Sequence, residues 1–357
     1  DTSGNIYYQR TGRVPRRPAG YDWSKPVDGS ISATEWQGFH PATDHVQLLN
    51  PPQGYMQNCN IPPDAMLVNS PLVKEKYPDY VYGSNGGSTN QRGARAIELL
   101  SQDDSVTIDE AVAFAVDVHP AGVERWIEML KMADAKFVDS LRTNPDYVAG
   151  VEDLLGWDQQ LDRGSSGALK YYYWRAQIVD DYGGEDVGDA ARRIDFLFNP
   201  VVEKPVPPIE LTDEELQAAV ASLENAMAKL KEDFGSLSAV YGDKFRVGRD
   251  DRSWPVGGGG QYGTTTLRVV NYDSEHEDHT RWGRSGQTST QICVMTKPVQ
   301  SWMYLPVGQS DRPDSPNYTS YAENAFSIRE LQPTWWQPED LVGHIESRTV
   351  LENAPSP

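Results

Sequence analysis

The stretch Asn50-Pro51-Pro52-Gln53-Gly54-Tyr55-Met56-Gln57-Asn58-Cys59-Asn60-Ile61-Pro62-Pro63 is the most informative part of this sequence. Its first six residues combine proline and glycine as a turn does, and a short extended run follows them. The surrounding segment, residues 1–90, is dense in glycine, proline and aromatic residues and contains short strand-like pieces such as Gly4-Asn5-Ile6-Tyr7-Tyr8. We therefore expect an irregular, β-rich N-terminal segment.

The next segment, residues 91–235, is predicted to be helical. Thr107 and Glu110 have the spacing of a capping box, in which the hydroxyl accepts from the third amide and the carboxylate reaches back. Thr212 is a second N-cap candidate, because an acidic first turn and two later lysines suit the helix dipole. The predicted helices cover residues 92–100, 107–118, 123–141 and 213–233.

The last segment, residues 236–357, is predicted to hold most of the strands. Extended runs are expected at 264–272, 291–296 and 300–305, with helical turns at 318–330 and 338–347. Three prolines stiffen residues 201–208, which form either a domain boundary or, in our preferred interpretation, a surface crossover inside one domain. The three segments predict one α+β structural unit with a helical block between β-rich ends.

Composition excludes several classes of protein. The 357 residues carry a formal net charge of −20, from 32 Lys+Arg and 52 Asp+Glu. Clustered basic residues for nucleic acid are missing, and the acidity disfavours anionic membrane surfaces. No run approaches the roughly 18 apolar residues of a membrane span. The polar N-terminus lacks the features of a signal peptide, which fits a cytosolic protein, a removed leader or an internal start.

Few local motifs carry chemistry by themselves. No G-x-S-x-G elbow is present, and Gly257 to Gly260 lack the Lys-Ser/Thr of a P-loop, so they predict a turn or close packing. His276-Glu277-Asp278-His279 lacks a third ligand at a recognised spacing and is interpreted as a solvated acidic loop, not a metal site. The aromatic runs 171–174 and 335–336 are interpreted as core or interface.

Two cysteines do not make a disulfide framework or a zinc site. Cys293 lies in an apolar run and is expected to be a buried thiol, not a nucleophile. Whether Cys59 pairs with Cys293 stays open.

Three separated segments carry motifs in a fixed order. The first contains Trp36-Gln37-Gly38, Asn50-Pro51 with Gly54, and Asn58-Cys59-Asn60-Ile61-Pro62-Pro63. The second contains Tyr241-Gly242, Pro255-Val256-Gly257-Gly258 and Thr264-Thr265-Thr266. The third contains Gly308-Gln309-Ser310 and Ser315-Pro316-Asn317-Tyr318. This arrangement resembles the penicillin acylase (penicillin amidase) family of N-terminal nucleophile hydrolases, and looks closest to the branch that cleaves acyl-homoserine lactones and lipopeptides.

The resemblance implies an αββα sandwich and amide hydrolysis by a serine at a chain's own N-terminus, with the α-amine as base. Such an enzyme acts on linear amides and needs a donor for the oxyanion of the acyl transfer. By resemblance that donor is the side-chain amide of Asn60, with Asn58 as the second choice. An arginine on the following helix lies near it in the family, and Arg92 fits best, with Arg95 second.

Two departures from the family pattern matter. The nucleophile is not in this sequence, because Asp1 does not match it, so the chain resembles the C-terminal part of a catalytic β chain. The expected partners are the α chain and the nucleophile-bearing part, made by autoproteolytic processing of a zymogen, together with an N-acyl small-molecule substrate. Asn317 also stands where the family usually has histidine. Asn60 and Arg92 are unaffected by that change.

The resemblance also implies a periplasmic or extracellular heteromer that requires no cofactor. It allows a structural calcium ion, but the sequence does not place its ligands. One alternative is a non-catalytic scaffold or binding subunit of the same family. A second is an unrelated carbohydrate-binding or adhesion protein, suggested by the aromatic, glycine and proline content.

Overall fold

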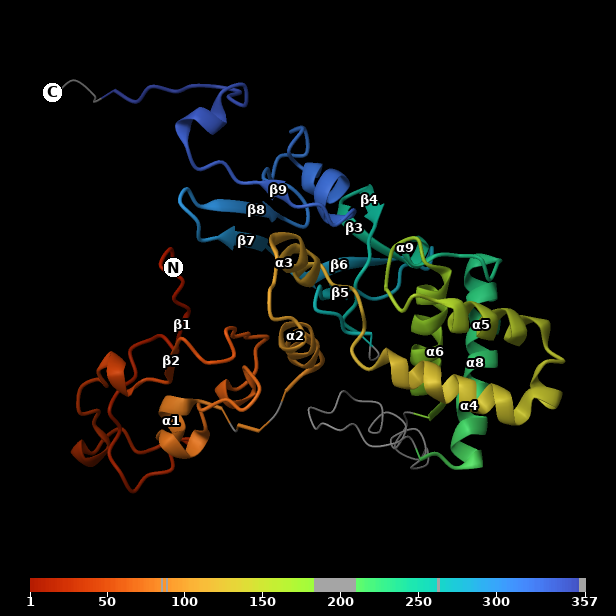
Figure 1. Ribbon diagram of the computed structural model, residues 1–357, viewed down its shortest axis with the longest axis horizontal. Coiled ribbons are helices and arrows are strands. Elements are labelled where there is room, and N and C mark those ends of the chain that lie inside the picture. The colour runs from red at the N-terminus through yellow and green to blue at the C-terminus, as the bar shows by residue number, and fades with distance from the viewer. Residues whose placement is uncertain (85, 88, 183–209, 262–263, 353–357) are drawn as a thin grey trace.

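The computed structural model describes residues 1–352 except 85, 88, 183–209 and 262–263, and it is an α+β structure (Figure 1). The predicted connector at 201–208 lies outside the described residues. A helical bundle stands at one side, two small sheets lie beside it, and the N-terminal segment forms a separate lobe (Figure 1). None of the helices in the described residues is long and apolar enough to cross a membrane.

The helical bundle consists of four helices that share one apolar core. They are α4 (Val123–Leu141), α5 (Pro145–Gly156), α6 (Ser166–Tyr182) and α8 (Asp213–Phe234). Trp126 and Trp174 meet edge to face at 5.5 Å, and the Trp174 indole donates to Ala219 O at 3.0 Å, so three helices are joined at one point. The predicted core role of the aromatic run 171–174 is confirmed, because all four residues are buried.

Helix ends follow the local signals in the sequence. Thr107 makes the predicted capping box with Glu110, and Thr212, predicted as an N-cap, also makes a capping box, with Glu215. Gly235 ends α8 in the left-handed conformation at φ 71°. Two further helices, α2 (Gln91–Ser101) and α3 (Ile108–Ala115), lie between the N-terminal lobe and the sheets (Figure 1). The predicted helix at 107–118 is therefore a few residues too long.

The described strands form three small sheets. The largest has the order β4-β3-β6-β5 and contains β3 (Phe245–Arg249), β4 (Arg252–Pro255), β5 (Val270–Tyr272) and β6 (Arg281–Gly286). In it only the β3–β6 pair is parallel. The second sheet is antiparallel with the order β7-β8-β9, formed by β7 (Thr290–Val294), β8 (Gln300–Tyr304) and β9 (Gln332–Pro333). The third pairs β1 (Tyr7–Gln9) with β2 (Gln47–Leu49).

Short helical pieces complete the chain. They are α1 (Asp79–Tyr82), α9 (Tyr241–Lys244), a π-helix at Ala322–Phe326 and 3₁₀ turns, among them Pro338–Leu341. The π-helix and the 3₁₀ turn at Pro338–Leu341 are much shorter than the helical turns predicted at 318–330 and 338–347. A small second core fills the N-terminal lobe, built from Val46, Met66, Leu67, Leu72 and Tyr82.

Only the end of the predicted strand at 264–272 is a strand. The amide of Arg268 donates to Asp117 O at 2.9 Å, and the Thr266 hydroxyl donates to Arg268 O at 2.7 Å. Because these backbone groups are already bonded outside a ladder, regular strand pairing starts only at Val270.

The glycines 257–260 form a closely packed turn, as predicted. Gly258 has φ +92°, and a Cβ there would lie 2.5 Å from Arg268 O. The cysteine prediction was wrong in one respect: Cys293 is exposed, because it faces outward on β7. Both cysteines are unpaired. Trp335 and Trp336 are exposed, which excludes a core role for them within this chain.

Gly258→Ala should lower the free energy of unfolding by at least about 3 kcal/mol, because the new methyl group meets backbone at a positive φ. Gly235→Ala is the matched control: its φ is also positive, but nothing lies within 4 Å, so strain alone should cost about 1 kcal/mol. Urea unfolding followed by circular dichroism measures both. Equal losses would show that the close contact at Gly258 does not matter.

Candidate active site

Asn60 occupies a tight bend at the end of the Asn-Cys-Asn motif. Its φ is +61°, a left-handed conformation that asparagine tolerates better than most residues. The amide N of Asn60 donates to Asn58 Oδ1 at 2.9 Å, and the next side chain, Ile61, is only 9% exposed. The bend is thus fixed from both sides while the Asn60 side chain stays exposed.

The start of α2 holds this bend. Asn90 caps the helix by accepting from Gly93 N at 2.9 Å, and its Nδ2 donates to Cys59 O at 2.7 Å. Arg92, in the first turn, donates from Nη2 to Cys59 O at 3.2 Å and to Asn60 Oδ1 at 2.8 Å. The structure therefore brings Asn60 and Arg92 together. Asn90 was missed by the sequence reasoning, although an asparagine just before a predicted helix is an ordinary N-cap signal.

The bond from Arg92 fixes the orientation of the Asn60 amide. A guanidinium only donates hydrogen bonds, so the atom that faces it must be Oδ1. The Nδ2 group consequently points away from Arg92 as a donor, and the hydrogen bonds among the described residues give it no acceptor. Asn60 can therefore donate to a negatively charged oxygen placed beside it.

The two second-choice residues, Arg95 and Asn58, make other hydrogen bonds. Arg95 forms ion pairs with Asp117 at 2.9 Å and Glu98 at 3.2 Å, and its side chain is 14% exposed. Burial lowers the pKa of Arg95, but the Asp117 carboxylate outweighs this effect and raises it. Asn58 accepts from the Asn60 amide. Of the two arginines, Arg92 is the one that contacts Asn60.

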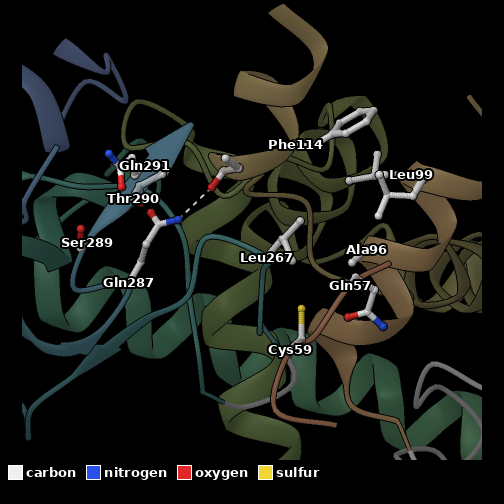
Figure 2. Close-up of a pocket in the computed structure, with 12 residues that line it drawn as sticks. Gln57, Cys59, Ala96, Leu99, Phe114, Leu267, Gln287, Ser289, Thr290 and Gln291 are labelled. Carbon is white, nitrogen blue, oxygen red and sulfur yellow. Dashed lines mark hydrogen bonds between the residues drawn. The ribbon is translucent and has the colours of Figure 1, made fainter. Parts of the chain in front are cut away.

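A cavity of about 370 Å³ lies next to this site (Figure 2). Cys59 points into it, and burial raises the pKa of its thiol, although Arg92 acts in the opposite direction. The wall is mostly apolar, with Leu99, Phe114 and Leu267. Gln287 closes one side by donating to Ala115 O at 2.8 Å (Figure 2). The cavity is thus lined by the Asn-Cys-Asn motif, by α2 and α3, and by the start of β7.

Asp233, Glu275 and His279 could offer ligand atoms within 4.8 Å of one another, as a metal site would require. Lysines already neutralise them: Lys244 donates to Glu275 at 2.6 Å and Lys229 to Asp233 at 2.7 Å. Burial raises the pKa of Glu275, but the bonds from Lys244 and His279 outweigh it and lower the pKa. We interpret the cluster as an ion-pair network. The rest of the predicted acidic loop, His276 to Asp278, is exposed as expected.

Comparison with known proteins confirms the predicted family. The family model for penicillin amidase matches residues 1–342. The chain belongs to the penicillin amidase family. Over 111 residues it is 34% identical to penicillin G acylase of Escherichia coli, and this alignment covers 31% of the chain and 12% of that relative. The aligned region is thus only a small part of the length of that acylase.

Arg95→Met should destabilise the chain by about 2 kcal/mol, because it leaves the mostly buried Asp117 carboxylate without its cation. Arg92→Met removes hydrogen bonds at an exposed bend and should cost less than about 1 kcal/mol. Urea unfolding of both variants measures the difference. A larger loss for Arg92→Met would mean that Arg92 is mainly a structural residue.

Proposed function

We propose that this chain is part of an acylase that hydrolyses the amide bond of an N-acylated small molecule or peptide. Membership of the penicillin amidase family supports this reaction class. The nucleophile in this proposal is an N-terminal serine on a polypeptide part outside these residues. Asp1 offers a carboxylate, and that carboxylate accepts hydrogen bonds from the amides of Ser3 and Asn5.

The contact between Arg92 and Asn60 carries the proposal. When the serine attacks the acyl carbon, the carbonyl oxygen becomes an oxyanion that must be stabilised by preplaced donors. Arg92 holds Asn60 Oδ1, so Nδ2 is presented as such a donor without a change of rotamer at the moment of reaction. In this assignment Asn60 touches the reacting oxygen, and Arg92 is a positioning residue.

The wider assembly is also part of the proposal. The chain would work as one component of a processed, periplasmic or extracellular heteromer, whose strands complete an αββα sandwich. No cofactor is required for serine acyl transfer. A structural calcium ion is compatible with it. If the complete assembly forms but does not hydrolyse amides, the chain is instead a non-catalytic scaffold subunit of the family.

Asn60→Gly should lower kcat for a chromogenic N-acyl amide by about 10²-fold or more in the assembled enzyme, because an oxyanion donor is lost. Glycine keeps the positive φ of 61°, so the variant removes the amide without adding backbone strain. Asn69→Gly is the matched control: it is also exposed, with φ 56°, and should keep full activity. Unchanged turnover of the Asn60→Gly variant would contradict the assignment of Asn60 as the oxyanion donor.

A further inference from the structure

The N-terminal lobe contains a second cavity, of about 1060 Å³, lined by parts of residues 17–24 and 74–84. It shares no lining residue with the cavity beside Cys59, and neither Asn60 nor Arg92 lines it. Its volume is at the upper end of the range of small-molecule sites, roughly 300–1,000 Å³. The wall is polar and aromatic, and includes Arg17, Tyr21, Trp23, Lys74 and Tyr80.

The start of the chain is locally basic, although the whole chain carries a net charge of −20. Residues 1–27 contain four arginines and one lysine against two aspartates. Within the described residues, none of these four arginines forms an ion pair with a carboxylate, whereas Lys25 pairs with Asp22. Acidic residues outnumber basic ones by 52 to 32, so a group of arginines without carboxylate partners is unexpected and indicates a place for an external anion.

Arg17 is the arginine of this group that lines the cavity. Its Cζ lies 5.0 Å from the ring centroid of Tyr80 and 5.6 Å from that of Trp23. Aromatic faces attract a cation, but they do not neutralise its charge as a hydrogen-bonded carboxylate does. Arg17 Nε is buried without a partner, whereas the two terminal nitrogens, which also have no acceptor among the described residues, are accessible to solvent. The terminal nitrogens are therefore unused donors at the cavity wall.

Both aromatic rings beside the guanidinium are fixed by hydrogen bonds. Trp23 Nε1 donates to Pro18 O at 2.8 Å. Tyr80 Oη lies 2.9 Å from His40 Nε2, and the other ring nitrogen of His40 lies 3.0 Å from Asp44 Oδ2. Because these side chains are already ordered, a ligand that binds here would lose little free energy to ordering them.

The acidic residues of the wall already have cations. Asp22 lies 3.0 Å from Lys25, and Asp79 lies 3.5 Å from Lys74. Both carboxylates are also well exposed, at 54% and 85%. Among the charged residues that line the cavity, Arg17 is thus the one without a counter-ion in the part of the chain that the structure describes.

We propose that this cavity binds a small organic anion, with a carboxylate on the terminal nitrogens of Arg17 and an apolar ring against Tyr21 and Trp23. The planar N–H fork of a guanidinium matches the two oxygens of a carboxylate. The Tyr21 and Trp23 rings lie 5.8 Å apart on the same wall and supply the apolar contact. A purely structural stacking role for Arg17 accounts for the rings, but not for accessible donors without a counter-ion. The proposal goes beyond the acylase reaction and does not depend on it.

Two probes that differ in charge but share a ring system test this site. Isothermal titration calorimetry with 2-naphthoate and with uncharged 2-naphthamide is carried out on the full chain, alone and assembled with the rest of the acylase. Naphthoate should bind at least about tenfold more tightly than naphthamide in both samples, because only the carboxylate forms charge-assisted hydrogen bonds. This preference should fall as sodium chloride is raised, because salt screens the attraction at an open site.

Arg17→Gln should weaken naphthoate binding at least about tenfold and leave naphthamide binding almost unchanged, because the charged donors are lost. Arg16→Gln is the matched control: it removes the same charge from the adjacent residue, which is exposed and does not line the cavity, so both affinities should stay the same. Circular dichroism checks that both variants fold. If Arg17→Gln does not fold, the comparison of the two probes on the unaltered chain still decides.

Four results would overturn the proposal. They are no binding of naphthoate, equal affinity for naphthoate and naphthamide, equal weakening by Arg16→Gln and Arg17→Gln, and binding to the free chain that is lost in the assembly. The last result would show that the acylase polypeptide covers the cavity. None of them concerns Asn60, whose role is measured by amide hydrolysis, so this proposal and the proposed function can fail separately.

Discussion

A single buried guanidinium holds the β-rich part of the molecule together. Arg268 is 0% exposed and donates to Gly257 O at 2.7 Å, to the Tyr304 hydroxyl at 3.2 Å and to Phe326 O. These acceptors belong to the glycine turn, to β8 and to the π-helix. Because a buried charge is costly unless its donors are satisfied, the three segments must keep these positions for the fold to be stable. The close packing of Gly258 against Arg268 O is part of the same constraint.

The constraint reaches the proposed active site through a short series of contacts. The Arg268 amide holds Asp117 O at 2.9 Å, and the Asp117 carboxylate pairs with Arg95 on α2. One turn earlier on the same helix, Arg92 bonds Asn60. Arg95 therefore fixes the helix to the scaffold, and Arg92 uses that fixed helix to orient the amide. Two arginines three residues apart on one helix thus have different tasks.

Local signals in the sequence predicted helix starts better than strand limits, although α5 and α6 were not among the predicted helices. The capping box at Thr107 and the N-cap at Thr212 are decided by residues within one turn, so they could be recognised directly. The strand at 264–272 was overestimated because its threonine-rich start bonds to the nearby glycine turn and Arg268 bonds to the distant Asp117, so neither pairs with a neighbouring strand. Cys293 was placed on the wrong face, since nothing local tells which side of β7 is covered.

The site was predicted in part, and for a different reason. Asn60 and Arg92 came from family resemblance, and the structure brings them into contact without testing their roles. The cavity could not be predicted, because its wall combines the motif, two helices and residues near 267 and 287–291. Such a site depends on tertiary packing, which no local pattern reports.

The exposure of Asn60 bears directly on the proposed function. An amide donor in water gains little from an oxyanion, because water competes for both groups and the high dielectric constant weakens their attraction. Oxyanion donors are effective where water is excluded. Asn60 is exposed in this chain, and the preceding residue, Cys59, lines the cavity. The proposed oxyanion role therefore requires that the rest of the acylase covers Asn60 and excludes water from it. In the proposed assembly the polypeptide that supplies the serine would also shield the donor, whereas the orientation of the donor is already fixed within this chain by Arg92.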